Sequence, residues 1–466
     1  MNSNSFSQGG QPSQAGESPA SQNRSQQPHA DVGFRESLST WLLIGATGFG
    51  GPAGQIAILH REIVERKKWI SEEEFLAALR LCMLLPGPEA QQLATYAGWR
   101  VGGLSGGLLA GTLFIIPGAI LVTALAWLHV AGESWPIISA GFHGLQSAVV
   151  ALVAMAAWRI GRKSVRSVGA GVLLVVSLCL LARGISFPVV LFVAAMVGVV
   201  FDVRGPKASG VHGKKNDHSQ SNAEAKVFCE KIPTKEDAAV DRGARRWWIW
   251  PLSVVFVGVI LWLVTFAGIA FFDLAAGRGG EIAILFTETT LLSIGGAYAV
   301  VPWALEESLL RGWLEPSERF DALAMGEATP GPLILVVTFI GFVAGWRPLH
   351  SPVQGLWGAA IATVFAFIPS FVMVLGMAPF IQKLRSGSWL DRSLSAIGAA
   401  VVAAIILLNW KLGVSAFVAD GKPALLPIIM AIISVLMLSK QVVPTPIVVV
   451  ASAAIGMLVH VMQASS

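Results

Sequence analysis

Long apolar segments separated by short polar connections dominate the pattern of the chain. They lie at about 38–59, 76–101, 104–130, 136–158, 168–183, 186–201, 248–272, 281–303, 321–345, 354–379, 393–412, 424–439 and 443–463. Several have roughly 18–25 residues, and a helix of about 20 apolar residues crosses a bilayer core of about 30 Å. The pattern therefore predicts an all-α integral membrane protein.

Two long regions break this pattern. Residues 1–37 are rich in Ser, Gln, Gly and Pro and lack a basic start followed by an apolar run. They are expected to form a disordered tail rather than a signal peptide. Residues 202–247 carry mixed charge and few apolar side chains, which predicts a solvent-exposed, disordered linker. Its His212, His218 and Cys229 have the spacing of no known metal site, and no metal is expected.

Composition supports the membrane assignment. The chain is 54% hydrophobic and only 13% charged, whereas soluble domains carry about 25% charged residues. Many of the 16 tryptophans flank apolar runs, as interfacial anchors do. The net charge of +5 is attributed to membrane topology rather than to nucleic-acid binding. Cys82 and Cys179 are far apart and are expected to be packing residues.

The second part of the chain repeats the first. GFGGPAGQ at 48–55 resembles IGGAYAVVPW at 294–303, and LLPGPEAQQ at 84–92 resembles ATPGPLILV at 328–336. Further landmarks match at separations of 244 and then 252 residues: Trp69 with Trp313, Pro86-Gly87-Pro88 with Pro330-Gly331-Pro332, Pro117 with Pro369, Val149-Val150 with Val401-Val402, and Trp158 with Trp410. Because six landmarks keep one order, we infer a duplication. The predicted parts are a first repeat at 38–201, a connector helix at 248–272 and a second repeat at 281–463.

A connector that crosses the membrane once between two equal halves gives the second half the opposite orientation in the membrane. The distribution of Lys and Arg tests this arrangement, because these residues concentrate in cytoplasmic loops. If the Pro-Gly-Pro segments turn back without crossing, the predicted cytoplasmic loops are 60–75, 159–167, the linker, 380–392 and residue 440. These loops hold 22 of the 33 Lys and Arg residues, and the predicted external loops hold seven. The count favours two inverted repeats with re-entrant or broken helices.

The paired Pro-Gly-Pro motifs predict helix breaks. Proline removes an amide donor and disfavours helix for the residue before it, so one helix should end near Leu85 and another start near Pro88. A helix that starts within the membrane presents unpaired N–H groups and a partial positive charge, which attract anions. Gly50-Gly51-Pro52 and Gly295-Gly296 add two expected breaks. The alternative is that these residues only kink and pack helices.

Polar side chains follow the first break. Gln91, Gln92, Thr95, Tyr96 and Arg100 have spacings that place several of them on one helical face. Arg100 is a candidate oxyanion ligand, or it extends to the interface beside Trp99. For Arg80, an ion pair with the nearby Glu72-Glu73-Glu74 cluster is expected.

Carboxylates near the breaks are candidates for proton coupling. Glu89 follows the first Pro-Gly-Pro, Glu327 precedes the second, and Glu288 lies in an apolar segment ahead of Gly295. A buried carboxylate can titrate near neutral pH. The alternative for Glu89 and Glu327 is helix capping or packing, and His143 is expected to be a core histidine with its hydrogen bonds satisfied.

These motifs resemble the chromate ion transporter (CHR) family in its long two-domain form. The resemblance covers about 36–460 and rests on FGGP-x-x-Q (Phe49 to Gln55), Trp69, LLPGP-x-x-Q (Leu84 to Gln91) and the GG and TPGP motifs of the second half. It implies export of chromate from the cytoplasm, driven by the proton gradient, with sulfate as a competitor. It also implies chromate resistance and a multi-pass location in a bacterial inner membrane.

The breaks and the resemblance together give a set of candidate binding residues. They are Gly50, Gly51, Pro52, Gln55, Pro86, Gly87, Pro88, Gln91, Gln92, Tyr96, Arg100, Gly295, Gly296, Thr329, Pro330, Gly331 and Pro332. The second half lacks sequence counterparts of Gln91, Gln92 and Arg100, and it has Ala297 where Pro52 stands. The two halves are therefore expected to have specialised.

Other functions are weighed against this one. A sulfate or other oxyanion permease stays open, because tetrahedral dianions share size and charge. A membrane-embedded enzyme would normally carry an Asp-rich metal motif or a His-based nucleophile set, and neither is present. A receptor or scaffold function would not explain the duplicated helix breaks. We expect no cofactor, no catalytic residues and no nucleic-acid partner, and a homodimer is a possible assembly.

Overall fold

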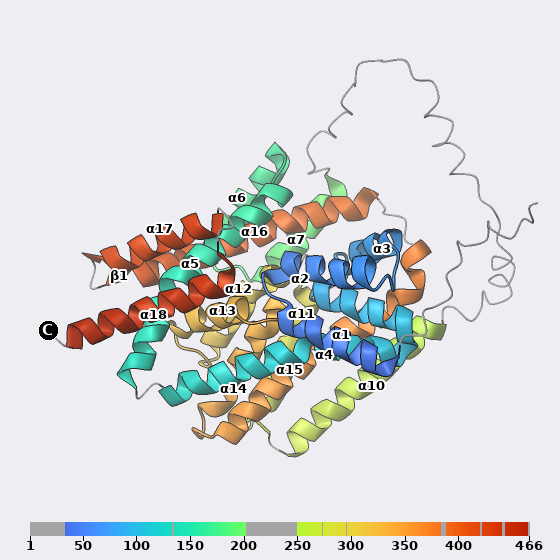
Figure 1. The fold of residues 1–466 in the computed structure, drawn as a ribbon. Helices are drawn as coiled ribbons and strands as arrows, with labels where there is room; N and C mark the ends of the chain where they lie inside the picture. Colours follow the sequence, from blue (N-terminus) through green and yellow to red (C-terminus); the bar gives the residue numbers. More distant parts are fainter. Residues whose placement is uncertain are drawn as a thin grey trace, which may run out of the picture.

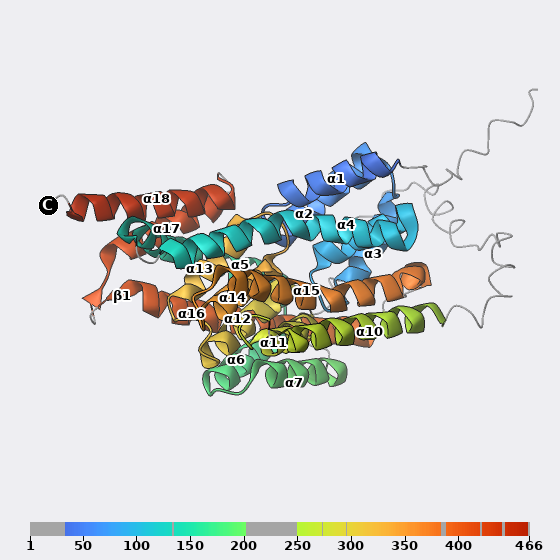
Figure 2. The ribbon, with the colours of Figure 1, turned by 90° about the horizontal axis from the view of Figure 1, so that it is seen from below.

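Most of the helices run between two opposite ends of the molecule, left and right in Figure 2. The computed structural model describes residues 33–132, 135–201, 249–272, 274–294, 296–383, 388–419, 422–439 and 443–464. Most of the predicted tail and the whole predicted linker, with His212, His218 and Cys229, lie outside these residues.

The first half is a series of helices with two breaks. It contains α1 (Phe34–Thr47), α2 (Gly51–Leu59), the π-helix η1 (His60–Arg66), α3 (Glu72–Cys82), α4 (Glu89–Gly132), α5 (Pro136–Ser164), α6 (Val168–Ala182) and α7 (Phe187–Val200). Within α4, Gly102 and Gly103 have non-helical backbone angles. A Cβ on Gly98 would overlap the carbonyl oxygen of Gly106, so the two arms of α4 pack against each other. The chain therefore reverses direction at Gly102 and Gly103.

The second half repeats this order after an extra helix. It contains α10 (Ile249–Phe271), α11 (Gly279–Leu292), α12 (Ala297–Leu310), α13 (Glu318–Ala328), the 3₁₀ turn η3 (Leu333–Leu335), α14 (Val336–Trp346), α15 (Pro352–Met377), the 3₁₀ segment η4 (Ala378–Lys383), α16 (Ser388–Phe417), α17 (Leu425–Ser439) and α18 (Thr445–Ala464). A two-residue hairpin, β1 (Val418–Ala419) with β2 (Lys422–Pro423), joins α16 to α17.

The halves are interlocked by reciprocal packing. Helix α5 of the first half packs against α17 and α18, and its counterpart α16 packs against α6 and α7 (Figure 1). The pairs α4 with α15 and α5 with α16 join equivalent helices across the middle. Such exchange of partners is what a pseudo-twofold relation between duplicated halves produces. Membrane sidedness, and with it the inverted orientation of the repeats, stays a prediction.

Six helices within the described ranges are long and apolar enough to cross a bilayer. They are Glu89–Gly132, Pro136–Ser164, Ile249–Phe271, Pro352–Ile381, Arg392–Phe417 and Thr445–Gln463. Helix α10 exposes most of its large apolar side chains, including Phe256 and Val264. Exposure of such an apolar surface to water is unfavourable, whereas contact with lipid tails is not. The prediction of an all-α membrane protein is confirmed.

Both Pro-Gly-Pro motifs interrupt helices, with boundaries that differ slightly from those predicted. Helix α3 ends at Cys82, three residues before the expected Leu85, and α4 begins at Glu89. The last residues before the first motif form turns, with Leu85 N donating to Leu81 O at 3.0 Å. After the second motif the chain passes through η3 before α14 begins. Pro86 disfavours helix for Leu85, and the residues between Cys82 and Pro86 form turns instead.

Candidate substrate site

The two Pro-Gly-Pro turns each pack against a proline-containing helix of the other half. A Cβ on Gly87 would lie 2.8 Å from Ser370 Oγ, directly after Pro369 in α15. A Cβ on Gly118, directly after Pro117 in α4, would overlap the carbonyl oxygen of Pro330. Each turn therefore sits beside the position that follows the matched proline. The two turns therefore make equivalent contacts with the opposite halves.

The glycine breaks reach across the same boundary. Gln55 Nε2 donates to Gly331 O at 2.5 Å and to Gly48 O at 3.2 Å. Gly331 N donates to Gly48 O at 3.1 Å. These bonds tie the break before α2 to the second Pro-Gly-Pro turn.

Gly296 makes the corresponding approach to the first turn. A Cβ on Gly296, whose φ is +101°, would lie 3.1 Å from both carboxylate oxygens of Glu89. Glycine is required there both by the positive φ and by the nearness of the carboxylate. Each break of one half therefore touches the Pro-Gly-Pro region of the other.

Helix N-termini give this region its partial positive charge. The first intrahelical bond of α4 runs from Gln92 N to Pro88 O at 3.0 Å, so the N–H groups before Gln92 have no acceptor within the helix. In the second half, the first such bond runs from Leu335 N to Pro332 O at 2.9 Å. The two N–H groups before Leu335 therefore also have no acceptor within the helix. A helix start in a buried place is suited to an anion.

Buried amide side chains surround the first turn. Gln91 Nε2 donates to Thr95 Oγ1 at 2.9 Å, and Gln91 Oε1 accepts from Ser370 Oγ at 2.6 Å. Gln92 Nε2 donates to Pro86 O at 2.8 Å. The Oε1 atoms of Gln55 and Gln92 are buried without a partner among the described residues. They are free to accept a hydrogen bond from water or from a protonated ligand.

One exposed cation and one tyrosine complete the region, and sequence reasoning missed both. Tyr298 at the start of α12 donates its hydroxyl hydrogen bond to Glu327. Arg159 of α5 interacts electrostatically with Glu327 and with Tyr298. A usable signal existed, because Arg159 directly follows the repeat landmark Trp158. It was instead assigned to a cytoplasmic loop.

Arg100 and Tyr96 lie at the base of the first hairpin, away from its turn. Both bind Glu74 at the start of α3: the Arg100 guanidinium through an ion pair and the Tyr96 hydroxyl at 2.8 Å. The ion pair that was expected for Arg80 is thus made by Arg100. Arg80 is exposed, and its Nε donates to the Leu76 carbonyl at 3.2 Å.

The second hairpin has the same fastening. Arg347, just after α14, donates to Glu318 at the start of α13, with an Nη2–Oε2 distance of 2.7 Å. Arg347 is therefore a structural counterpart of Arg100, which comparison at a fixed separation did not reveal. We call these contacts the first clasp (Glu74–Arg100) and the second clasp (Glu318–Arg347). In each, the start of the first arm meets the end of the second, so the hairpin turns back on itself.

The two clasps lie at opposite ends of the molecule. The second arm of α4 starts beside the first clasp, and His129 in its last turn is 3.2 Å from Glu318 of the second clasp. Some 25 helical residues separate the two points, which corresponds to about 37 Å. The Pro-Gly-Pro hairpins therefore open toward opposite ends.

The remaining candidates are placed as follows. Gly50 and Gly51 have φ of +90° and +67°, and Pro52 stands in the first turn of α2. Thr329 is buried and bonded to Met325 O, whereas Glu288 is exposed and does not join the proton-coupling candidates Glu89 and Glu327. Gly295 lies outside the described residues. His143 is exposed rather than in the core, and its Nδ1 is bonded to Ser139 O.

Metal ligation finds no support in the part of the chain that the structure describes. No group of three His, Cys, Asp or Glu side chains there is placed to hold a metal ion. Cys82 is a buried free thiol and Cys179 an exposed one.

Known proteins with similar sequences are transport proteins. The chain is 28% identical to a probable chromate transport protein of Synechococcus elongatus over 92% of this chain and 96% of the relative. It is 28% identical to a chromate transport protein of Pseudomonas aeruginosa over 80% of each chain. A chromate transport protein of Cupriavidus metallidurans is 27% identical over 92% of this chain and 93% of its own. No solved structure matches the chain.

The family match covers both halves. The family model described as Chromate transporter matches residues 35–199 and residues 280–457. Together these ranges take in both Pro-Gly-Pro hairpins and both glycine breaks. The chain is a multi-pass membrane protein and belongs to the chromate transporter family.

Proposed function

We propose that this protein exports chromate from the cytoplasm across a bacterial inner membrane, driven by the proton gradient, and so confers chromate resistance. The observation that carries the proposal is that the glycine break of each half contacts the Pro-Gly-Pro region of the other half, where buried helices begin. Their unpaired N–H groups form a positive, buried region without a metal. A small dianion such as chromate matches this charge.

Electrostatics favour the outward direction. Moving one charge through 100 mV changes the free energy by about 2.3 kcal/mol, so a dianion leaving a negative interior gains about 4.6 kcal/mol. Arg159, which lies in a predicted cytoplasmic loop, adds a cation near Glu327 on the expected entry side. Glu89 and Glu327 are the carboxylates that stand at the breaks and can exchange protons there.

Flux through inside-out membrane vesicles tests the function directly. Vesicles containing the protein are expected to accumulate radiolabelled chromate, and to accumulate more when the lumen is acidified. Control vesicles carry the same membrane without the protein. Absence of chromate accumulation above these controls would refute the proposal. Unlabelled sulfate is expected to compete, and labelled sulfate that accumulates while chromate does not would identify a sulfate permease instead.

Replacement of Arg159 by Gln is expected to raise the KM for chromate roughly tenfold, because a cation at a partly exposed site contributes about 1–2 kcal/mol to anion binding. The measurement is the concentration dependence of initial chromate uptake into the same vesicles. Arg162→Gln is the matched control on the same helix, since Arg162 stacks over Trp158 with 5.7 Å from Cζ to the ring centroid. Equal KM values for both variants and the wild type would remove Arg159 from the entry path.

Homodimer formation stays a prediction.

A further inference from the structure

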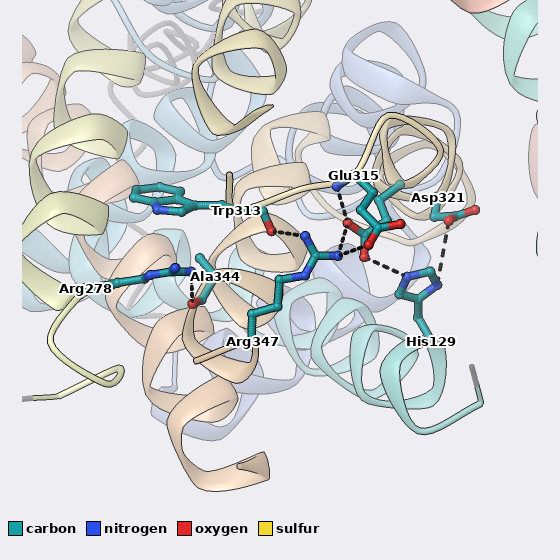
Figure 3. A network of polar contacts seen from close by, with 8 residues as sticks. His129, Arg278, Trp313, Glu315, Asp321, Ala344 and Arg347 are labelled. Carbon is teal, nitrogen blue, oxygen red and sulfur yellow. Dashed lines mark hydrogen bonds and ion pairs between the residues drawn. The ribbon is translucent and has the colours of Figure 1, made fainter. Parts of the chain in front are cut away.

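A buried polar cluster adjoins the second clasp (Figure 3). His129, near the end of α4, lies between two carboxylates of α13: its Nε2 is 3.2 Å from Glu318 Oε1 and its Nδ1 is 3.6 Å from Asp321 Oδ2. Arg347 Nη2 approaches Glu318 from the other side, and Arg347 Nη1 donates to the carbonyl of Trp313 at 3.1 Å. His129, Glu318 and Asp321 are only 8%, 3% and 5% exposed. We call these three residues the proton cluster.

An imidazole between two carboxylates cannot satisfy both while it is neutral. Neutral histidine carries one N–H, so when Nε2 donates to Glu318 the lone pair of Nδ1 faces Asp321. Two acceptors in this position repel each other unless a proton lies between them. One further proton, on Asp321 or on His129 Nδ1, removes the repulsion.

The charge balance of these buried groups also calls for one additional proton. Among the described residues, with neutral His129, two carboxylates face one cation, Arg347, which leaves one negative charge among these buried groups. Such an uncompensated buried charge is costly, and one proton neutralises it. Asp321 lies on α13, outside the spanning helices, and burial raises its pKa to about 7. The charge of His129 acts in the opposite direction, and the carboxylate of Glu318 raises the pKa of Asp321 further.

The neighbouring charged groups in the part of the chain that the structure describes bind other partners. Arg319 of α13 turns toward Glu306, 3.4 Å away, which also holds Lys411 at 3.0 Å. Glu315 is mostly exposed and lies 3.5 Å from Arg347. Helices α5 and α18, which also pack against α13, contribute His143 and His460, both lining an adjacent cavity.

Protons have a route between the proton cluster and solvent. A cavity of about 220 Å³ is lined by His129, Glu318 and Asp321 together with exposed His143. A water molecule occupies about 30 Å³ in the liquid, so several fit. The connections at 131–135 and 304–320 are those predicted to be external, and their described residues Gly132, Glu315 and Ser317 line this cavity.

The link to transport is the second hairpin itself. Glu318 belongs both to the proton cluster and to the second clasp, and α13 leads directly into Thr329 and the Pro-Gly-Pro turn. The first clasp has Tyr96 where the second has the imidazole. His60, near the first clasp, also lies between two carboxylates, but these are the exposed Glu65 and Glu72, whereas the carboxylates beside His129 are buried.

We infer that His129 and Asp321, with Glu318, form an external proton-binding site that takes up one proton and thereby controls the second hairpin during chromate export. This inference rests on the proposed function only for the identity of the transported anion. Loss of the proton restores the repulsion between His129 and Asp321 and weakens the second clasp. Gain of the proton neutralises the proton cluster and strengthens the second clasp.

Infrared pH titration of the purified full-length protein tests proton binding without any transport. The wild type is expected to show a protonated-carboxyl band that disappears as the pH rises through about 7, and Asp321→Asn is expected to lack this band. A band that persists unchanged in Asp321→Asn overturns the inference, and so does a wild type in which neither this carboxyl band nor an imidazolium band of His129 changes with pH.

Transport in inside-out vesicles tests the coupling. One pH unit, acid in the lumen, is expected to raise wild-type chromate accumulation up to about tenfold for each proton exchanged. Asp321→Asn and His129→Gln should keep chromate–chromate exchange at equal pH yet lose the response to the gradient. The control His143→Gln, which lines the same cavity, should keep both. A full gradient response in both cluster variants contradicts the inference, whereas absence of exchange in the wild type contradicts the proposed function.

Discussion

Gly118→Ala is expected to abolish most chromate transport and to lower the stability of the protein. The added Cβ would overlap the carbonyl oxygen of Pro330, which is backbone and cannot rotate away. Overpacking a tight contact costs about 1–3 kcal/mol, and here the strain falls on the Pro-Gly-Pro turn. The measurements are chromate uptake in inside-out vesicles and the thermal unfolding midpoint of the purified protein.

The matched control is Gly268→Ala in α10, where a Cβ would meet no atom within 4 Å. This control is expected to transport chromate at the wild-type rate and to unfold at the wild-type temperature. If Gly118→Ala behaved like Gly268→Ala, the close approach between α4 and the second turn would not matter for transport.

Arg347→Gln is expected to be the most destabilising single change among the ion pairs of the described residues. It leaves Glu318, only 3% exposed, with less compensation for its charge. Breaking a buried pair by removing one partner costs about 3–5 kcal/mol. We therefore expect a strong loss of folded protein in the membrane, measured by detergent-extracted yield and unfolding midpoint.

Rescue distinguishes this cause from simple loss of packing. The double variant Glu318→Gln with Arg347→Gln removes both charges and is expected to recover much of the lost stability. The control Arg311→Gln breaks a partly exposed pair with Glu307, separated by 3.8 Å, and should change stability by less than about 1 kcal/mol. A double variant as unstable as Arg347→Gln alone would contradict the charge argument.

The sequence was sufficient for the features that local chemistry determines. Paired Pro-Gly-Pro motifs predicted two helix breaks, because proline restricts the backbone wherever it stands. Length and hydropathy predicted the membrane helices for the same reason. The separation of 244 residues that shifts to 252 predicted the duplication, and both halves match one family.

Other features depend on which residues meet in three dimensions. Arg347 was not recognised as the counterpart of Arg100, because the change of separation falls between the Pro-Gly-Pro motif and Pro117. Exposed Glu288 was included because apolar neighbours in sequence do not reveal which way a side chain faces. Arg159 and His129 escaped notice because their carboxylate partners come from the other half of the chain. For such contacts one sequence carries no local signal.

The exchanged packing of α5 has a consequence for the order of biogenesis. Gly144 of α5 approaches the last helix so closely that a Cβ there would lie 2.9 Å from the Cα of Gly456 in α18. This face of the first half therefore stays without its partner until ribosomes have made α18. The first half enters the bilayer as an unfinished assembly, and a helix of the second half completes it.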